Sequence, residues 1–343
     1  MSEQNGILHL GIDLGTSRSA VSASNGERHM VESYVGWPVD MVAHRLLKKK
    51  VLVGREALEN RPMLSLQRPL EHGLIKEGSE KDQSAVRELL HHLISLIGVN
   101  PKEKNRPSVR AVVGVPAEAL RVNKQNLRNA LKGIADNLMI VSEPFAVAYG
   151  LEALRYTMII DIGAGTSDFC VMKGRFPTDE DQRTLTNAGD SIDEQLDKLV
   201  RERYPEAQFS IHMVRDWKER WSFVGESMIP VVVTVPVAGK PTQLDITNEM
   251  RSACESILPP LTETMVDLLS RVEPEFQEKV RNNVTLAGGC SLISGLAKSV
   301  QQSLSEVGGG RVRVVKDPMF AGSDGGLTIA LDAPSSDWEM LST

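Results

Sequence analysis

The chain has few cysteines, few aromatic residues and no excess of positive charge. Its 343 residues include three cysteines, none paired in a Cys-x-x-Cys spacing, which excludes a dense disulfide framework and a zinc-finger pattern. A net charge of −6 gives no sign of the positively charged surface that binds nucleic acid, so we expect no nucleic-acid partner. No apolar run approaches the roughly 20 residues of a membrane span, and the N-terminus is unlike a secretory signal. These absences predict a cytoplasmic protein without direct membrane insertion.

Length and hydropathy patterning predict two α/β units. A chain of 343 residues is too long for one typical domain, and an apolar fraction of 41% suffices for two cores. A strand hairpin is expected over 8–24, and a similar hairpin over 157–173. Each is followed by an irregular polar segment and by further helices and strands, which indicates an internal duplication.

Several other elements follow from periodicity. Residues 82–97 carry apolar side chains at helical spacing and predict an amphipathic helix. One long helix is expected over 248–271, and residues 334–343 are expected to form a short polar tail. The Lys48–Lys50 run predicts a solvated hairpin tip.

The two hairpins share an unusual bend. In "GIDLGTSRSAV" (11–21) and "IIDIGAGTSDFCV" (159–171), an apolar strand reaches Asp13 or Asp161 and then turns through glycines and hydroxyls. A tight turn directs backbone N–H groups at phosphate, and a nearby carboxylate is explained if Mg²⁺ lies between them. Asp and Gly also serve ordinary turns, but the matched pair favours Mg²⁺–nucleotide between two halves. The hydroxyls of Thr16, Ser17 and Thr166 are expected to donate to phosphate.

A third segment, "VSEPFAVAYGL" (141–151), begins an apolar helix at Glu143–Pro144. Proline suits the first helical position and a carboxylate suits the helix dipole, so Glu143 has a purely structural interpretation. In the functional interpretation, Glu143 lies at the mouth of the cleft. There it aligns or deprotonates the water that attacks a γ-phosphate.

A fourth segment, "VTLAGGCSLISGL" (284–296), places a double glycine between a strand and a helix. Gly288 and Gly289 would let a flat adenine lie against bare backbone, and Ser291 is expected to cap the helix. The simpler alternative is an ordinary turn.

Together with "VVGVPAEAL" and "DPMFAGSDGGLTIAL", these segments resemble, in order, the five nucleotide-binding motifs of the actin superfamily, shared with chaperone ATPase domains and sugar kinases. The resemblance implies an α/β, actin-like fold of two ribonuclease-H-like domains around a nucleotide cleft, each with a smaller inserted subdomain. The implied division is 1–32, 72–151 and 327–343 for the first core, 33–71 for its insertion, 152–186 and 243–326 for the second core, and 187–242 for its insertion.

The resemblance also implies roles for individual residues. Asp13 and Asp161 would serve Mg²⁺ and its waters, with Glu143 and Asp161 acting in catalysis. Glu194 matches a ribose-contacting glutamate, whereas Arg215 and Asp324 depart from the family pattern. The phosphates would be lined by Gly15, Thr16, Ser17, Gly163, Gly165 and Thr166, and the adenosine by Lys218, Ser222, Gly288, Gly289 and Ser291.

Among bacterial actins, the sequence of these motifs resembles the magnetosome-organising MamK type more than the cell-shape MreB type. This implies an ATP-dependent, filament-forming cytoskeletal ATPase that uses ATP/ADP and Mg²⁺, associates with itself and binds organelle adaptor proteins, as in positioning magnetosome chains. Two alternatives stay open: a membrane-associated MreB-type actin, and a monomeric small-molecule kinase of the same fold.

Overall fold

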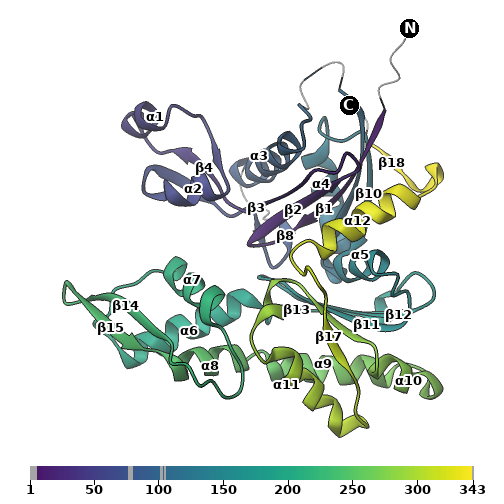
Figure 1. Cartoon of the computed structure of the whole chain (residues 1–343). Helices are drawn as coiled ribbons and strands as arrows, with labels where there is room; N and C mark the ends of the chain where they lie inside the picture. Colours follow the sequence, from purple (N-terminus) through teal and green to yellow (C-terminus); the bar gives the residue numbers. More distant parts are fainter. Residues whose placement is uncertain (1–5, 76–79, 101–102, 104–105, 342–343) are drawn as a thin grey trace.

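The computed structural model describes residues 6–75, 80–100, 103 and 106–341, and its core contains two mixed β-sheets (Figure 1). In the first sheet the order is β18-β10-β9-β1-β2-β3, and in the second it is β13-β12-β11-β16-β17. The strands of the first are β1 (Ile7–Leu14), β2 (Arg18–Ala23), β3 (Arg28–Glu32), β9 (Ser108–Val115), β10 (Asn137–Ser142) and β18 (Glu339–Met340). Those of the second are β11 (Arg155–Ile162), β12 (Ser167–Lys173), β13 (Gln182–Leu185), β16 (Val284–Ala287) and β17 (Val312–Val314).

The two sheets repeat one topology. In each, three consecutive antiparallel strands are followed by two strands that add parallel to the first. Both predicted hairpins are present, as β1–β2 and β11–β12. The predicted duplication of an α/β unit is therefore confirmed. The boundaries drawn between cores and insertions stay a prediction.

Two helices, α5 (Glu143–Gly150) and α12 (Ala321–Asp332), join the units. Val147 of α5 and Ile329 of α12 share one buried cluster with Val112 of the first sheet and Ile159 of the second. A side chain at Gly325 would overlap the backbone of α5, so glycine permits this close helix contact. The outer layers are α3 (Glu80–Leu96) and α4 (Leu120–Leu131) on the first sheet, and α9 (Leu258–Ser270), α10 (Pro274–Arg281) and α11 (Leu296–Ser303) on the second.

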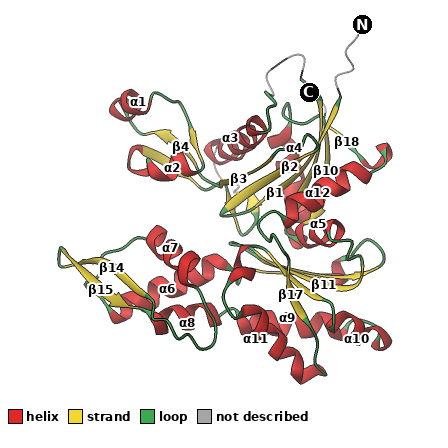
Figure 2. Ribbon diagram, in the orientation of Figure 1, coloured by secondary structure: helices red, strands yellow, loops and turns green. Residues whose placement is uncertain are grey.

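Two smaller lobes project from the same side of the molecule (Figures 1 and 2). The first contains β4 (Val35–Pro38), α1 (Met41–Leu47), β5 (Leu52–Val53), α2 (Arg55–Glu59) and β6 (Leu64–Gln67), and it returns through β7 (Leu70–Glu71) and β8 (Leu74–Ile75). The second contains α6 (Gly189–Arg203), α7 (Ile211–Trp221), β14 (Val232–Val237), β15 (Lys240–Asp245) and α8 (Thr247–Glu255).

Three local predictions are wrong. The helix expected over 248–271 breaks after Glu255, because Pro259 and Pro260 lack the N–H groups that a continuous helix needs. The expected polar tail instead buries Trp338 and adds β18 to the first sheet. The Lys48–Lys50 run follows α1 rather than forming a hairpin tip, with Lys48 in the left-handed conformation that ends the helix.

The amphipathic helix predicted over 82–97 is confirmed. Its apolar face is buried against the first sheet, with Leu89, Leu93 and Ile97 in the core. In the described part of the chain, no helix combines the length and the hydropathy that crossing a bilayer requires.

Candidate functional site

A cavity of about 450 Å³ lies between the two units. Its walls come from the β1–β2 and β11–β12 turns, the first residue of α5, one side of α7 and the segment after β16. Segments far apart in the sequence therefore converge where the motifs predicted a cleft. The predicted site residues that line it are Asp13, Gly15, Thr16, Ser17, Glu143, Asp161, Gly163, Gly165, Thr166, Lys218, Ser222, Gly288 and Gly289.

Two predicted site residues do not line the cavity. Glu194 is exposed on α6. Ser291 is buried, and its hydroxyl donates to the carbonyl oxygen of Gly288 at 2.7 Å. Ser291 thus stabilises the turn after β16 rather than capping α11, which begins after Gly295, so the expected helix cap is wrong. The nucleotide contacts of Glu194 and Ser291 stay predictions.

The two hairpin turns meet across the cavity. A side chain at Gly165 would overlap the hydroxyl of Thr16, so this close approach requires glycine. The Thr16 hydroxyl accepts a hydrogen bond from the N–H of Gly73 at 3.0 Å, and Nδ1 of His72 lies 3.2 Å from the carbonyl oxygen of Gly165. The turns are thus held together at the position where phosphate was predicted.

Four carboxylates, Asp13, Glu143, Asp161 and Asp168, form what we call the acidic wall. Burial, and then the charge of Asp168, raise the pKa of Asp13 to about 6. Burial, followed by the charge of Asp13, raises the pKa values of Glu143 and Asp161 well above their usual range. Several carboxylates share one poorly solvated region, so the wall favours protons or a cation.

Asp168 is the functional candidate that the sequence analysis missed. It is only 1% exposed, and it lies directly opposite Asp161 in the β11–β12 ladder. Its Oδ1 accepts from the Thr184 hydroxyl at 2.5 Å and from the N–H of Ala117 at 3.1 Å. Burial still raises the pKa of Asp168 to about 6. The hairpin register was a usable signal, because it places two carboxylates of one motif side by side.

The donor set of the acidic wall suits a magnesium ion that arrives with phosphate. Within the described ranges, no three carboxylate, imidazole or thiolate side chains form a metal-binding group by themselves. Mg²⁺ commonly takes one or two carboxylates and completes its shell with water and substrate phosphate oxygens. Oδ2 of Asp168 is buried without a hydrogen-bond partner among the described residues. Asp168 does not line the cavity, so Asp13 and Asp161 are the aspartates that face a bound cation.

The double glycine after β16 forms the part of the cavity lining next to Asp161. Gly288 has a φ of 73°, and a side chain there would overlap Oδ1 of Asp161. Glycine is therefore required for this turn to approach the acidic wall. Gly289 borders Met319, and Leu292, Ile293 and Pro318 add apolar lining that could accept a flat base.

The wall formed by α6 and α7 carries charges that are already paired. Nζ of Lys218 donates to the carbonyl oxygen of Gly189 at 2.6 Å and lies 2.7 Å from Oδ1 of Asp193. Burial raises the pKa of Asp193, although Lys218 and Arg215 oppose this shift. Arg215, noted above as a departure from the family pattern, also lines the cavity.

The duplicated sheets, the cavity between them and the paired hairpin turns define an actin-like protein. The family model described as MreB/Mbl protein matches residues 7–335. The chain therefore belongs to the MreB/Mbl family. It is 40% identical over 334 residues to the actin-like protein MamK of Paramagnetospirillum magneticum, covering 97% of this chain and 95% of that protein. The cell shape-determining protein MreB of Escherichia coli is 25% identical over 262 residues, covering 74% and 73%.

Solved structures give the same result. A MamK double helical filament superposes with a TM-score of 0.92 at 40% identity, covering 96% of this chain and all of that chain. A non-polymerising MamK variant bound to AMPPNP superposes with a TM-score of 0.71 at 40% identity, covering 95% and 99%. The predicted actin-like fold and the closer likeness to MamK than to MreB are confirmed.

Proposed function

We propose that this chain is a cytoplasmic, filament-forming ATPase that binds ATP with Mg²⁺ between its two units. The observation that carries the proposal is the acidic wall beside two touching hairpin turns. Carboxylates that have no cationic side chain among the described residues, next to phosphate-type turns, are explained by a metal–nucleotide ligand. A MamK variant that binds AMPPNP supports the nucleotide class.

In this proposal each part of the cavity has one task. Asp13 and Asp161 hold Mg²⁺ through its waters, and Mg²⁺ supplies positive charge to the phosphates. Gly15, Thr16 and Ser17 on one side, and Gly163, Gly165 and Thr166 on the other, donate N–H and hydroxyl groups to phosphate oxygens.

Glu143 orients the attacking water and accepts its proton. It is the first residue of α5, whose buried apolar side chains fix its position. Burial and the charge of Asp13 raise its pKa, which makes its carboxylate a stronger base. Within the described residues, no cation pairs with its carboxylate, so the group is available to a ligand.

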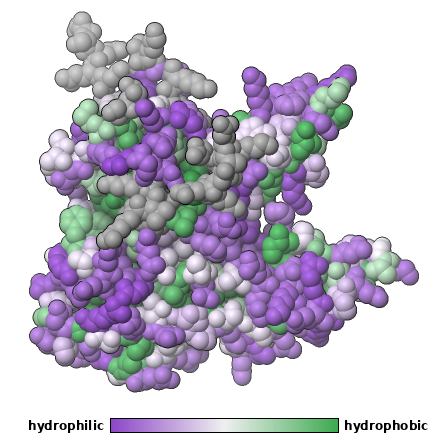
Figure 3. Space-filling model, turned by 180° about the vertical axis from the view of Figure 1, so that it is seen from behind, coloured by the Kyte–Doolittle hydropathy of each residue, from purple (hydrophilic) through white to green (hydrophobic). Residues whose placement is uncertain are grey.

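Self-association is the partner we propose first, because the filament of MamK superposes on this chain. The lobe that carries α1 exposes apolar side chains at its tip, including Met41 at 83% and Leu46 at 65% exposure (Figure 3). ATP binding would favour assembly, and hydrolysis would later weaken the contact. By analogy with the MamK relatives, we propose an organelle such as a magnetosome chain, reached through adaptor proteins, as the cargo.

Sedimentation and electron microscopy with and without ATP–Mg²⁺ test this proposal. We expect filaments that pellet with ATP–Mg²⁺, whereas a monomeric kinase would stay in the supernatant. Binding to liposomes would favour the MreB-type alternative.

The Glu143→Gln variant tests the chemistry. Phosphate release should fall roughly 10²-fold, the scale of a positioned acid or base, while ATP binding and pelleting persist. Glu202→Gln, an exposed change on α6, is the matched control. Normal phosphate release by folded Glu143→Gln protein would remove Glu143 from the mechanism.

A further inference from the structure

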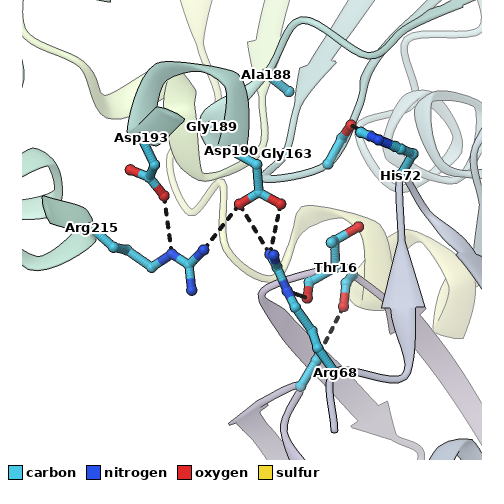
Figure 4. Close-up of polar contacts among 12 residues, drawn as sticks. Thr16, Arg68, His72, Gly163, Ala188, Gly189, Asp190, Asp193 and Arg215 are labelled. Carbon is cyan, nitrogen blue, oxygen red and sulfur yellow. Dashed lines mark hydrogen bonds and ion pairs between the residues drawn. The ribbon is translucent and has the colours of Figure 1, made fainter. Parts of the chain in front are cut away.

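The ion pair between Arg68 and Asp190 crosses from one unit to the other beside the cavity (Figure 4). A hydrogen bond from Arg215 to Tyr34 crosses there as well, and so does the more exposed ion pair between Arg18 and Glu219. We call Arg68, Asp190 and Arg215 the cleft bridge. Arg68 lies between β6 and β7 in the first unit, whereas Asp190 lies in the first turn of α6 and Arg215 on α7, both in the second unit. The two units thus touch through charged side chains next to the proposed phosphate site.

Arg68 contacts both units at once. Its Nε donates to the carbonyl oxygen of Thr16 at 2.9 Å, in the first hairpin turn. Its Nη2 lies 2.8 Å from Oδ2 of Asp190. The planar guanidinium presents donors in two directions, so one side chain connects a phosphate-type turn to the opposite unit.

Arg215 makes the second crossing. Its Nη2 donates to Oδ1 of Asp190 at 3.2 Å, and its Nε donates to Asp193 at 3.1 Å. Its Nη1 donates to the hydroxyl of Tyr34 at 2.5 Å, and Tyr34 is a buried residue of the first unit. Asp190 therefore receives an arginine from each unit.

The side chains of the cleft bridge are less exposed to solvent than those of an ordinary surface ion pair. The side chains of Arg68, Asp190 and Arg215 are 23%, 18% and 15% exposed. The Arg201–Asp197 pair on the same helix α6 is 47% and 24% exposed. Arg201 also donates to the carbonyl oxygen of Phe209 at 3.1 Å, so all contacts of this pair stay within the second unit. Sheltered, hydrogen-bonded charges are screened less by water and salt, so the bridge makes the stronger contact.

We propose that the cleft bridge holds the two units together around bound nucleotide and sets the rate at which nucleotide leaves. This inference rests on the proposed function, because it takes the cavity to be the nucleotide site. The contacts exist only while the units are close, so losing them increases the population of open molecules. An open cleft exposes the nucleotide to solvent and releases it faster.

Two variants with opposite effects on local charge test the proposal. Asp190→Asn makes the region more positive, whereas Arg68→Gln makes it more negative. We would load each protein with Mg²⁺ and a fluorescent ADP, add excess unlabelled ADP and follow release by stopped flow. ADP avoids any contribution from hydrolysis. If the bridge sets release, both variants should release ADP roughly tenfold faster. If phosphate attraction sets it, the two rates should move in opposite directions.

The matched controls are Asp197→Asn and Arg201→Gln, which make the same chemical changes in the exposed pair on α6. Their release rates should stay within about twofold of the parent protein. The double variant of Arg68 and Asp190 should release no faster than either single variant, because both lose one shared contact. If Arg68→Gln does not fold, Arg68→Lys is the alternative variant. Lysine keeps the charge but lacks the planar guanidinium that donates to Thr16 and Asp190 at once, so this variant should still release ADP faster.

Unchanged release in folded Asp190→Asn and Arg68→Gln proteins, or opposite shifts, would overturn the proposal while leaving the nucleotide site intact. A parent protein that binds no fluorescent ADP would overturn the proposed function and the bridge together. The loading step separates these two failures, since it reports binding before any release is measured.

Discussion

The acidic wall and the cleft bridge lie beside the same cavity, which Asp13, Glu143 and Asp161 of the wall and Arg215 of the bridge line. Their charges are arranged in opposite ways. In the acidic wall, Asp13, Asp161 and their neighbours face one another with no cationic side chain of the described residues between them, and their pKa values rise. In the bridge, Asp190 receives two arginines, and each arginine has a further acceptor.

This difference distinguishes two roles: the charges of the acidic wall bind a ligand, whereas those of the cleft bridge hold the two units in position. A carboxylate cluster without a cation destabilises the ligand-free fold and is retained where a ligand supplies the missing charge. In a fully paired network, a ligand would gain little free energy by binding to the charges. Such a network instead affects how closely the two units approach each other.

The largest effect is expected from Asp161→Ala. It removes one of the carboxylates assigned to Mg²⁺, so phosphate release should fall roughly 10²-fold or more. The ligand-free protein should remain folded, because a repelling charge is lost. Phosphate release and thermal unfolding measured on one preparation check this. A normal rate would show that the Mg²⁺ assignment is wrong.

Gly288→Ala should damage stability through two separable causes. Gly288 combines a φ of 73° with a ψ of 163°, a conformation that essentially only glycine adopts. A side chain there costs roughly 1–3 kcal/mol, and the overlap with Asp161 adds to it. Gly239 has a similar φ of 77° but open space around it, so Gly239→Ala reports the cost of a positive φ without an overlap. Urea unfolding of both variants checks this. Equal losses would mean that Gly288 is not needed for the approach to the acidic wall.

Asp13→Asn should stabilise the nucleotide-free protein at neutral pH. The pKa of Asp13 rises from 3.8 to about 6 on folding, so its contribution to stability is present below about pH 4 and is lost as pH rises through 6. Asparagine does not ionise, so the variant does not lose this stability as the pH rises. We expect a gain of up to about 3 kcal/mol near pH 7 that disappears below about pH 4. Chemical unfolding across this range checks it, and a gain independent of pH would contradict the repulsion.

The smallest effect is expected from a paired but exposed cluster outside the cleft. Arg28 pairs with Asp317 and Asp324 and lies over the ring of Phe320, yet these charges are 38–50% exposed. Arg28→Ala should cost less than about 1 kcal/mol in unfolding free energy and leave ADP release unchanged. A tenfold change in release would show that exposed charges outside the bridge also control the release of ADP.

The sequence predicted what is local and repeated. The two hairpins, their acids and glycines, and the helix beginning at Glu143 are encoded within short segments, so each was visible before the structure. The break between α8 and α9 was also local, since Pro259 and Pro260 mark it, but the helical periodicity hid it.

What the sequence did not predict depends on tertiary pairing. Arg68 and Asp190 are 122 positions apart and lie in different units, so no spacing rule connects them. The pairing of β18 with β10 likewise joins residues about 200 positions apart through a two-residue strand with little pattern of its own. Glu194 was placed by motif alone, and the fold leaves it exposed while its neighbour Asp193 takes the buried position.

Proton release on ligand binding tests the central claim most directly, namely that the acidic wall receives the cation of a metal–nucleotide. Near pH 6 the wall holds protons, because the pKa values of Asp13 and Asp168 are about 6. Calorimetry in buffers of different ionisation enthalpy, with excess Mg²⁺ and a non-hydrolysable ATP analogue, counts the protons that binding displaces. The account predicts net proton release that is reduced in Asp13→Asn. Binding with no proton release, or with proton uptake, would contradict it.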